Sequence, residues 1–172
     1  DITMLVMDYI KEKNINIVFD TDIEELVIAC DHDKIEHVIL NLLSNAIKYT
    51  PKGGEIIVYI KYKKDKVIVS VKDNGVGISK DKLGLIFEKF GQANYCLTRP
   101  CEGSGIGLSL VKSLIELHGG NVYVKSIEGE WSEFLFEIPN KIIENKSQKI
   151  RDISYLEFQR EKCNIEFSNI YS

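Results

Sequence analysis

Hydrophobic and polar residues change their period early in the chain. They alternate over residues 14–20, as in a half-buried strand, and an apolar run predicts a second strand at residues 26–30. From Asp33 the period becomes three to four residues, which predicts an amphipathic helix with Asp33 and Glu36 as its capping pair. Residues 50–54 (TPKGG) should end this helix. Its expected inward residues are Ile35, Val38, Ile39, Leu42, Leu43 and Ala46.

The following residues predict a sheet interrupted by two helices. Lys64 and Asp65 should form a hairpin turn, Ser79 should cap the first helix, and Gly119 should end the second. Residues 91–103 have no periodicity and are expected to form a long loop. The expected strands are residues 55–63, 66–73, 121–126 and 133–138, and the expected helices are residues 79–87 and 108–118.

Composition places the chain among ordinary globular proteins and excludes several classes. The 172 residues suit one domain, and a net charge of -4 argues against a nucleic-acid-binding protein. No apolar run is long enough to span a membrane, and the first residues lack a signal peptide and an initiator Met. The four cysteines form no Cys-x-x-Cys pair and the three histidines have no metal-ligand spacing, so we expect reduced thiols in the cytoplasm.

Two glycine motifs carry candidate nucleotide chemistry. In Asp73-Asn74-Gly75-Val76-Gly77, at a strand end, an Asp can accept a hydrogen bond from an adenine amino group, although the motif also suits a simple turn. Residues 102–108 (EGSGIGL) open a helix and could present backbone N–H groups to phosphates. This second motif is neither a Walker loop nor a good dinucleotide-binding fingerprint.

Polar residues follow one edge of the first long helix. Asn41, Asn45 and Lys48 are spaced by four and three, so two amide oxygens could bind magnesium and one ammonium could bind phosphate. A merely solvated helix face is the alternative. Phe87 and Phe90, spaced by three, are typical of core packing.

These four motifs, in this order, resemble the catalytic domains of sensor histidine kinases, which share a superfamily with gyrase-type ATPases. The resemblance covers about residues 15–139 and is carried by NLLSNAIKYTPKGG, VKDNGVGI, IFEKF and EGSGIGLSLVKSLIELHGG. It implies an α+β fold, a two-layer sandwich in which three helices cover one face of a mixed, mostly antiparallel sheet. It also implies ATP and Mg²⁺ as ligands.

The resemblance assigns roles to individual residues. Asp73 would accept the adenine amino group, Asn45 with Asn41 would bind magnesium, and Lys48 would reach phosphate oxygens. Arg99 would contact phosphate from the family's ATP lid. The catalytic residues implied are Asn41, Lys48 and Arg99. The nucleotide-binding residues implied are Asn45, Tyr49, Asp73, Gly75, Gly77, Ile78, Phe90, Gly103, Ser104, Gly105, Ile106, Gly107 and Leu108.

The resemblance also implies a reaction and its partners. Gyrase-type relatives have a catalytic Glu at the position of Asn41, and an amide cannot act as a general base, so hydrolysis should be poor. We expect phosphoryl transfer to a histidine on a separate helical domain of the same kinase, with a response regulator as an indirect partner. The full-length protein could be a homodimer and membrane-anchored, with this domain in the cytoplasm.

The expected organisation has three parts, and three other functions stay open. Residues 1–12 would be the remnant of the linker from the missing phosphoacceptor domain, 13–140 the catalytic domain, and 141–172 an extension. A helix at 146–160 and an edge strand at 164–168 are hypothesised for that extension. The other functions are a gyrase-like ATPase, an anti-sigma-type serine kinase, and a non-enzymatic binding domain.

Overall fold

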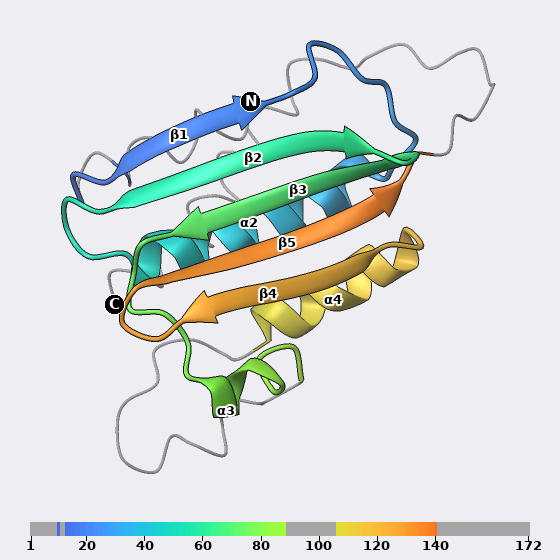
Figure 1. Cartoon of the computed structure of the whole chain (residues 1–172). Helices are drawn as coiled ribbons and strands as arrows, with labels where there is room; N and C mark the ends of the chain where they lie inside the picture. The colour runs from blue at the N-terminus through green and yellow to red at the C-terminus, as the bar shows by residue number, and fades with distance from the viewer. Residues whose placement is uncertain (1–9, 11–12, 89–105, 141–172) are drawn as a thin grey trace.

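A mixed sheet of five strands forms one layer of the molecule, and helices form the other (Figure 1). The computed structural model describes residue 10 and residues 13–88 and 106–140. The strand order is β1-β2-β3-β5-β4, in which β1 pairs parallel with β2 and every other pairing is antiparallel. The strands are β1 (Asn16–Thr21), β2 (Glu55–Lys63), β3 (Lys66–Asp73), β4 (Asn121–Ile127) and β5 (Trp131–Pro139).

Helices α2 (His32–Tyr49) and α4 (Gly107–Leu117) lie behind the sheet in the view of Figure 1, and the short α3 (Lys80–Leu83) lies beyond the β4 edge. This arrangement, with three helices among the described residues, confirms the predicted fold class.

The predicted inward-facing residues of α2 are also confirmed. Val38, Leu42, Leu43 and Ala46 are at most 3% exposed, and Ile35 and Ile39 pack against the same core. Buried residues of the strands β2, β3 and β5, mostly at alternate positions, form the other side of that core.

The start of α2 differs from the sequence prediction. The N-cap is Asp31, whose carboxylate accepts a hydrogen bond from the Lys34 backbone N–H at 3.2 Å. Asp33 therefore lies inside the first turn, where its charge suits the positive end of the helix. Glu36 is buried and forms an ion pair with His32, so it does not take part in a capping box.

The predicted strand at residues 26–30 is wrong. This segment is extended, with Leu26, Ile28 and Cys30 packed against the core and Val27 80% exposed, but it pairs with no strand of the described sheet. In the structure, its side chains alternate between partly buried and exposed, because only one side of the segment faces the core. An apolar run in the sequence indicates burial but cannot show whether a strand lies alongside.

The remaining described elements lie close to their predicted positions. Lys64 and Asp65 form the hairpin turn, Thr50 is the C-cap of α2, and Gly119 follows α4 with a positive φ of 71°. The predicted helix at 79–87 is shorter than expected, because only residues 80–83 are helical and turns follow to residue 87. The expected loop at 91–103 and both expected elements of the extension lie outside the described residues.

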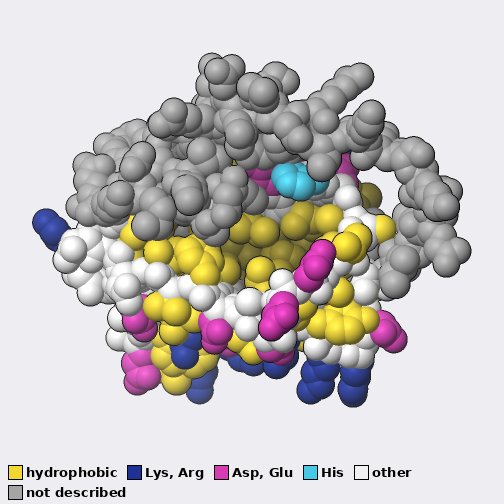
Figure 2. Space-filling view, turned by 90° about the horizontal axis from the view of Figure 1, so that it is seen from above, with side chains coloured by type: hydrophobic (Ala, Val, Ile, Leu, Met, Phe, Trp, Pro, Cys, Tyr) yellow, Lys and Arg dark blue, Asp and Glu magenta, His cyan; other side chains and the backbone are white. Residues whose placement is uncertain are grey.

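The β1 edge carries exposed hydrophobic side chains. In the view of Figure 2, hydrophobic side chains extend across the middle of the described surface. Val18 and Phe19 of β1 are 39% and 44% exposed, and Ile60 and Tyr62 of β2 are each 38% exposed. Within the described ranges, no helix combines the length and the apolar composition needed to cross a bilayer.

Candidate nucleotide-binding site

The first part of the site is a buried carboxylate at the end of β3. Asp73 is only 4% exposed, and its Oδ1 accepts a hydrogen bond from the Gly75 backbone N–H at 2.9 Å. Burial raises the pKa of Asp73 from 3.8 to about 6, although hydrogen bonds from the Gly75 and Ser132 backbones oppose this rise. A buried carboxyl with a raised pKa is uncommon in a purely structural position and is a frequent feature of binding sites.

The loop after Asp73 is fixed from two sides. The Val76 N–H donates to the Tyr49 carbonyl at the end of α2 at 3.3 Å, and the Gly129 N–H donates to the Val76 carbonyl at 2.8 Å. Gly77 has a φ of 65°, and a Cβ there would overlap the Ile127 carbonyl oxygen. The loop therefore packs tightly between helix α2 and the β4–β5 turn, which requires glycine at this position.

The second part of the site lies where α2 meets α4. Asn41 is 7% exposed on α2, and Gly107 begins α4. A Cβ at Gly107 would overlap the Asn41 Oδ1 and come within 3.2 Å of its Cγ. Two motifs that lie 66 residues apart in sequence thus meet directly, and a larger residue at 107 would require the Asn41 amide to move.

The last turn of α2 contains Lys48 and Tyr49 and contacts the first part of the site. The Lys48 ammonium lies 5.6 Å from the centre of the Tyr49 ring, and Tyr49 is 41% exposed. A Cβ at Gly75 would overlap the Tyr49 carbonyl oxygen, so the helix end touches the loop that follows Asp73. One helix therefore connects the carboxylate to the glycine at the start of α4.

The site combines hydrogen-bonding groups suited to different parts of a nucleotide. A buried carboxylate can accept from an exocyclic amine, amide oxygens can bind a hard cation, and the start of α4 offers N–H groups to phosphate. The family described as histidine kinase-, DNA gyrase B- and HSP90-like ATPase matches residues 30–142.

The chain belongs to this family. It is a catalytic ATP-binding domain of the sensor histidine kinase type, as the sequence predicted. It is 34% identical to the catalytic domain of the histidine kinase ThkA, with a TM-score of 0.71, over 81% of this chain and 88% of that one. It is also 30% identical to full-length ShkA in complex with AMPPNP, with a TM-score of 0.70, over 80% of this chain and 28% of that one.

The curated relatives are much longer than this ATPase domain. The sensor histidine kinase WalK of Bacillus subtilis is 34% identical over 76% of this chain, which spans 22% of WalK. The circadian input-output histidine kinase CikA of Thermosynechococcus vestitus is 41% identical over 63% of this chain, which spans 15% of CikA. Most of each relative therefore lies outside the matched region.

The predicted site residues fall into two sets. Phe90, Arg99, Gly103, Ser104 and Gly105 lie outside the described residues, so their roles stay predictions. Phe87 is described, and its ring packs edge-on against Phe134 with centres 6.3 Å apart, as its spacing indicated. Ile78 and Leu108 pack against the core, and Ile106 is 46% exposed.

Sequence reasoning overlooked the serines beneath the loop. Ser126 Oγ accepts a hydrogen bond from the Ile78 N–H at 2.7 Å and donates to the Trp131 carbonyl at 2.7 Å. Ser132, whose backbone contributes a hydrogen bond to Asp73, also lies within 3.1 Å of Ser126 Oγ. Neither serine is part of a motif. Only the pairing of β4 with β5 brings them below the loop that follows Asp73.

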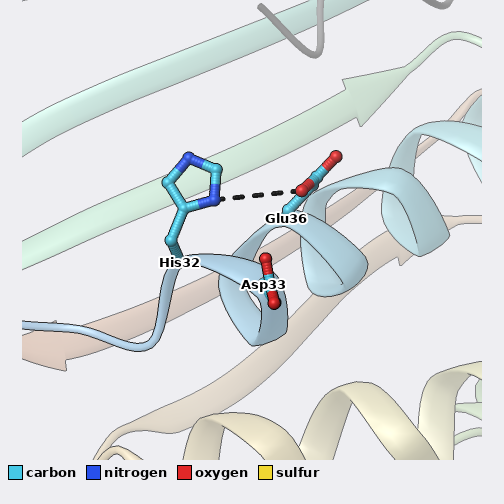
Figure 3. Close-up of side chains that lie close together, drawn as sticks. All are labelled: His32, Asp33 and Glu36. Carbon is cyan, nitrogen blue, oxygen red and sulfur yellow. Dashed lines mark ion pairs between the residues drawn. The ribbon is translucent and has the colours of Figure 1, made fainter. Parts of the chain in front are cut away.

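A cluster of His32, Asp33 and Glu36 lies at the start of α2, away from this site (Figure 3). His32 Nδ1 is 3.9 Å from Glu36 Oε2, and possible ligand atoms of all three residues lie within 4.8 Å of one another. His32 and Glu36 are spaced by one helical turn, and the Glu36 side chain is buried whereas that of His32 is exposed. Sequence spacing had suggested no histidine cluster.

His118 has a structural role at the end of α4. Its Nδ1 lies 2.7 Å from the Leu114 carbonyl, and its Nε2 accepts the Asp31 N–H at 3.1 Å. A neutral ring protonated on Nδ1 satisfies both contacts. The ring thereby joins the end of α4 to the N-cap of α2, at the opposite end of α2 from Lys48.

Proposed function

We propose that this domain binds Mg-ATP and donates the γ-phosphoryl group to a histidine on a separate helical domain of a two-component sensor kinase. The contact between Gly107 and the Asn41 amide carries the proposal, because it joins the phosphate-facing start of α4 to the predicted magnesium-binding helix. The AMPPNP complex of ShkA supports an ATP-type ligand for this fold.

The described residues fit such a ligand. Asp73 would accept the adenine amino group, because it is a buried acceptor at the end of a narrow loop. Asn45, partly buried one turn after Asn41, would share the magnesium ion with it. Lys48 would reach phosphate oxygens, and the exposed ring of Tyr49 would flank the nucleotide. Bound Mg²⁺ would neutralise phosphate charge, which is its usual contribution to phosphoryl transfer.

The residues of the site favour transfer over hydrolysis. In the reaction, an imidazole nitrogen forms a bond to the γ-phosphorus while the bond to the β,γ-bridging oxygen breaks, which releases ADP and passes the imidazole proton to solvent. Asn41 occupies the position nearest the start of α4, and its amide has no basicity with which to activate water. The chain would therefore hold ATP for an external nucleophile.

The wider organisation is part of the same proposal. Residues 13–140 would form the catalytic domain, with a linker before it and an extension after it. The histidine would lie on the helical domain of the same kinase, and a response regulator would receive the phosphoryl group afterwards. The structure of ThkA in complex with the response regulator TrrA, 31% identical with a TM-score of 0.68, supports the second partner. Homodimerisation and membrane anchoring would belong to the full-length protein.

Calorimetry and phosphotransfer test the proposal directly. The native chain should bind Mg-ATP, and Asn45→Ala should weaken binding at least about tenfold, since a ligand of the metal is lost. Ser44→Ala is the matched control, because a neighbouring helical position points about 100° away. With radiolabelled ATP, the histidine-bearing helical domain supplied in trans should acquire acid-labile label.

Other outcomes identify the alternative functions. Acid-stable label on a serine of a partner protein would indicate a serine kinase, and rapid ATP turnover by the chain alone would indicate a gyrase-like ATPase. Absence of any nucleotide binding would leave a non-enzymatic binding domain. Equal affinity of Asn45→Ala and the native chain would remove only the magnesium assignment.

A further inference from the structure

The C-terminal end of α2 has an unusual set of hydrogen-bond donors. The last four carbonyl groups of any α-helix lack partners within the helix. In α2, the Ala46 carbonyl accepts from the Thr50 N–H at 2.9 Å and from Thr50 Oγ1 at 2.6 Å. The Tyr49 carbonyl accepts from the Val76 N–H at 3.3 Å. The two carbonyls between them, of Ile47 and Lys48, accept from a side chain outside the helix.

Lys13 supplies that donor from the segment that precedes β1. Its Nζ lies 2.8 Å from the Ile47 carbonyl and 3.3 Å from the Lys48 carbonyl. Its own carbonyl accepts the Gly53 N–H at 3.4 Å, so the residue is also held by its backbone. A cation at this position suits the negative end of the helix dipole. Lys13 thus completes the hydrogen bonding of all four terminal carbonyls.

This helix end is also the part of α2 that reaches the nucleotide site. Lys48 and Tyr49 belong to the turn whose carbonyls Lys13 binds, and the Tyr49 carbonyl touches the loop after Asp73. We propose that Lys13 is a positioning residue, which holds the last turn of α2 so that Lys48 and the loop after Asp73 face the nucleotide together. This role rests on the proposed ATP site.

The environment of Lys13 supports a role beyond a surface contact. Its ammonium is partly buried, and burial lowers its pKa, as does the nearby charge of Lys48. Two ammonium groups are therefore held near one another at the helix end that we assign to phosphate. A neutral residue at position 13 would leave two carbonyls without their donor and remove one positive charge from this region.

Three variants of the 172-residue chain test the role of Lys13. Lys13→Met keeps most of the apolar stem but removes both hydrogen bonds and the charge, whereas Lys13→Arg keeps a donor and the charge. Lys66→Met is the matched control. Lys66 Nζ binds Glu137 Oε1 at 2.6 Å, but at the far end of β3, about 23 Å from Asp73 along the strand.

Two measurements are made on each variant. In nucleotide-free protein, amide exchange at Thr50 and Val76 should become at least about tenfold faster in Lys13→Met and stay unchanged in Lys66→Met. By calorimetry, Lys13→Met should bind Mg-ATP about tenfold more weakly than the native chain. Lys13→Arg should keep most of the native affinity. Lys66→Met should bind like the native chain.

The outcomes separate this proposal from the proposed function. Unchanged exchange in Lys13→Met overturns the positioning role, and so does faster exchange with native affinity, which would make Lys13 a structural cap only. An equal loss of affinity in Lys66→Met would attribute the effect to general destabilisation and also overturn the role. If the native chain binds no Mg-ATP, the proposed function fails, and the positioning role that rests on it fails with it.

Discussion

The central strand β3 begins and ends in two very different environments. At its start, a two-residue hairpin connects it to β2, and Lys66 forms a partly buried ion pair with Glu137. At its end, about 23 Å away, Asp73 is buried and opens a loop packed against α2 and the β4–β5 turn. The hairpin end holds a pair of opposite charges, whereas the loop end buries a carboxylate.

The carboxyl groups at the two ends have pKa values shifted in opposite directions. The hydrogen bond from Lys66 lowers the pKa of Glu137, and further hydrogen bonds from Asn121 and Tyr123 act in the same direction. Burial raises the pKa of Asp73 to about 6. Glu137 therefore has partners that stabilise its charge, whereas the protein keeps Asp73 in a position that disfavours its charge. Such a position is expected where binding, and not stability, selects the residue.

The largest expected effect is that of Gly77→Ala at the loop end of β3. Alanine would have to adopt a positive φ and would also overlap the Ile127 carbonyl, so we expect a loss of about 3 kcal/mol or more. Gly53→Ala is the control, because Gly53 has a φ of 78° but no atom near its Cβ position, and it should cost only about 1 kcal/mol. Denaturant unfolding measures both. Equal losses would show that the loop is not tightly packed.

Asp73→Asn should separate binding from stability. The amide replaces one acceptor with a donor that faces the adenine amino group, so ATP affinity should fall roughly ten- to hundredfold. Glu137→Gln, at the opposite end of the sheet, should leave affinity unchanged. Calorimetry on both variants makes the comparison. Equal binding of guanine and adenine nucleotides by the native chain would contradict the role of Asp73.

The pH dependence of binding should follow the same carboxyl group. Asp73 titrates at a pKa of about 6, so ATP affinity should fall below pH 6, approaching about tenfold per pH unit if binding requires the carboxylate. The Asp73→Asn variant should lack this part of the pH dependence. Any pH dependence that it keeps can be assigned to protonation of ATP itself. A pH profile identical in both proteins would exclude Asp73 as the titrating group.

The two carboxyls should also affect folding stability with opposite signs. Folded Asp73 binds its proton more tightly than the unfolded chain does, so its contribution to stability increases as pH falls from about 6 toward 3.8. Glu137 stabilises the fold above its ordinary pKa of 4.5, and that contribution is lost as pH falls through its lowered pKa. Replacing each in turn should therefore change the acid limb of the stability curve in opposite directions.

Much of the fold could be predicted from the sequence, because its elements have strong local signals. The stripe of α2, the β2–β3 hairpin and the end of α4 follow from periodicity and turn residues, and the structure confirms them. The errors concern features that depend on a distant partner. Residues 26–30 form an apolar run but pair with no strand of the described sheet, and α2 begins two residues earlier than the Asp33 cap would allow.

The site was predicted unevenly for the same reason. The motifs gave Asp73, Asn41 and Lys48 through their order in the chain, and the family match supports the ATP-binding class. No pattern could have given Lys13, whose two acceptors lie 34 and 35 residues away. The same holds for Ser126, which reaches Ile78 across 48 residues. Support around a site is set by tertiary contacts, which a single sequence does not display.

The smallest expected effect, at the hairpin end of β3, is that of Lys64→Gly. Lys64 and Asp65 have φ values of 53° and 57°, and Lys tolerates this left-handed region less well than Asp does. Glycine should remove the strain and stabilise the fold by up to about 1 kcal/mol, partly offset by its greater freedom in the unfolded chain. Thermal unfolding should show a rise of about 2 °C in the melting temperature.

Lys63→Gly, in the neighbouring strand position, should instead destabilise the fold. ATP affinity should be unchanged in both, because the hairpin shares no contact with the α2 end or with Asp73. A change in affinity would mean that the two ends of β3 are coupled, and that the hairpin contributes to the site.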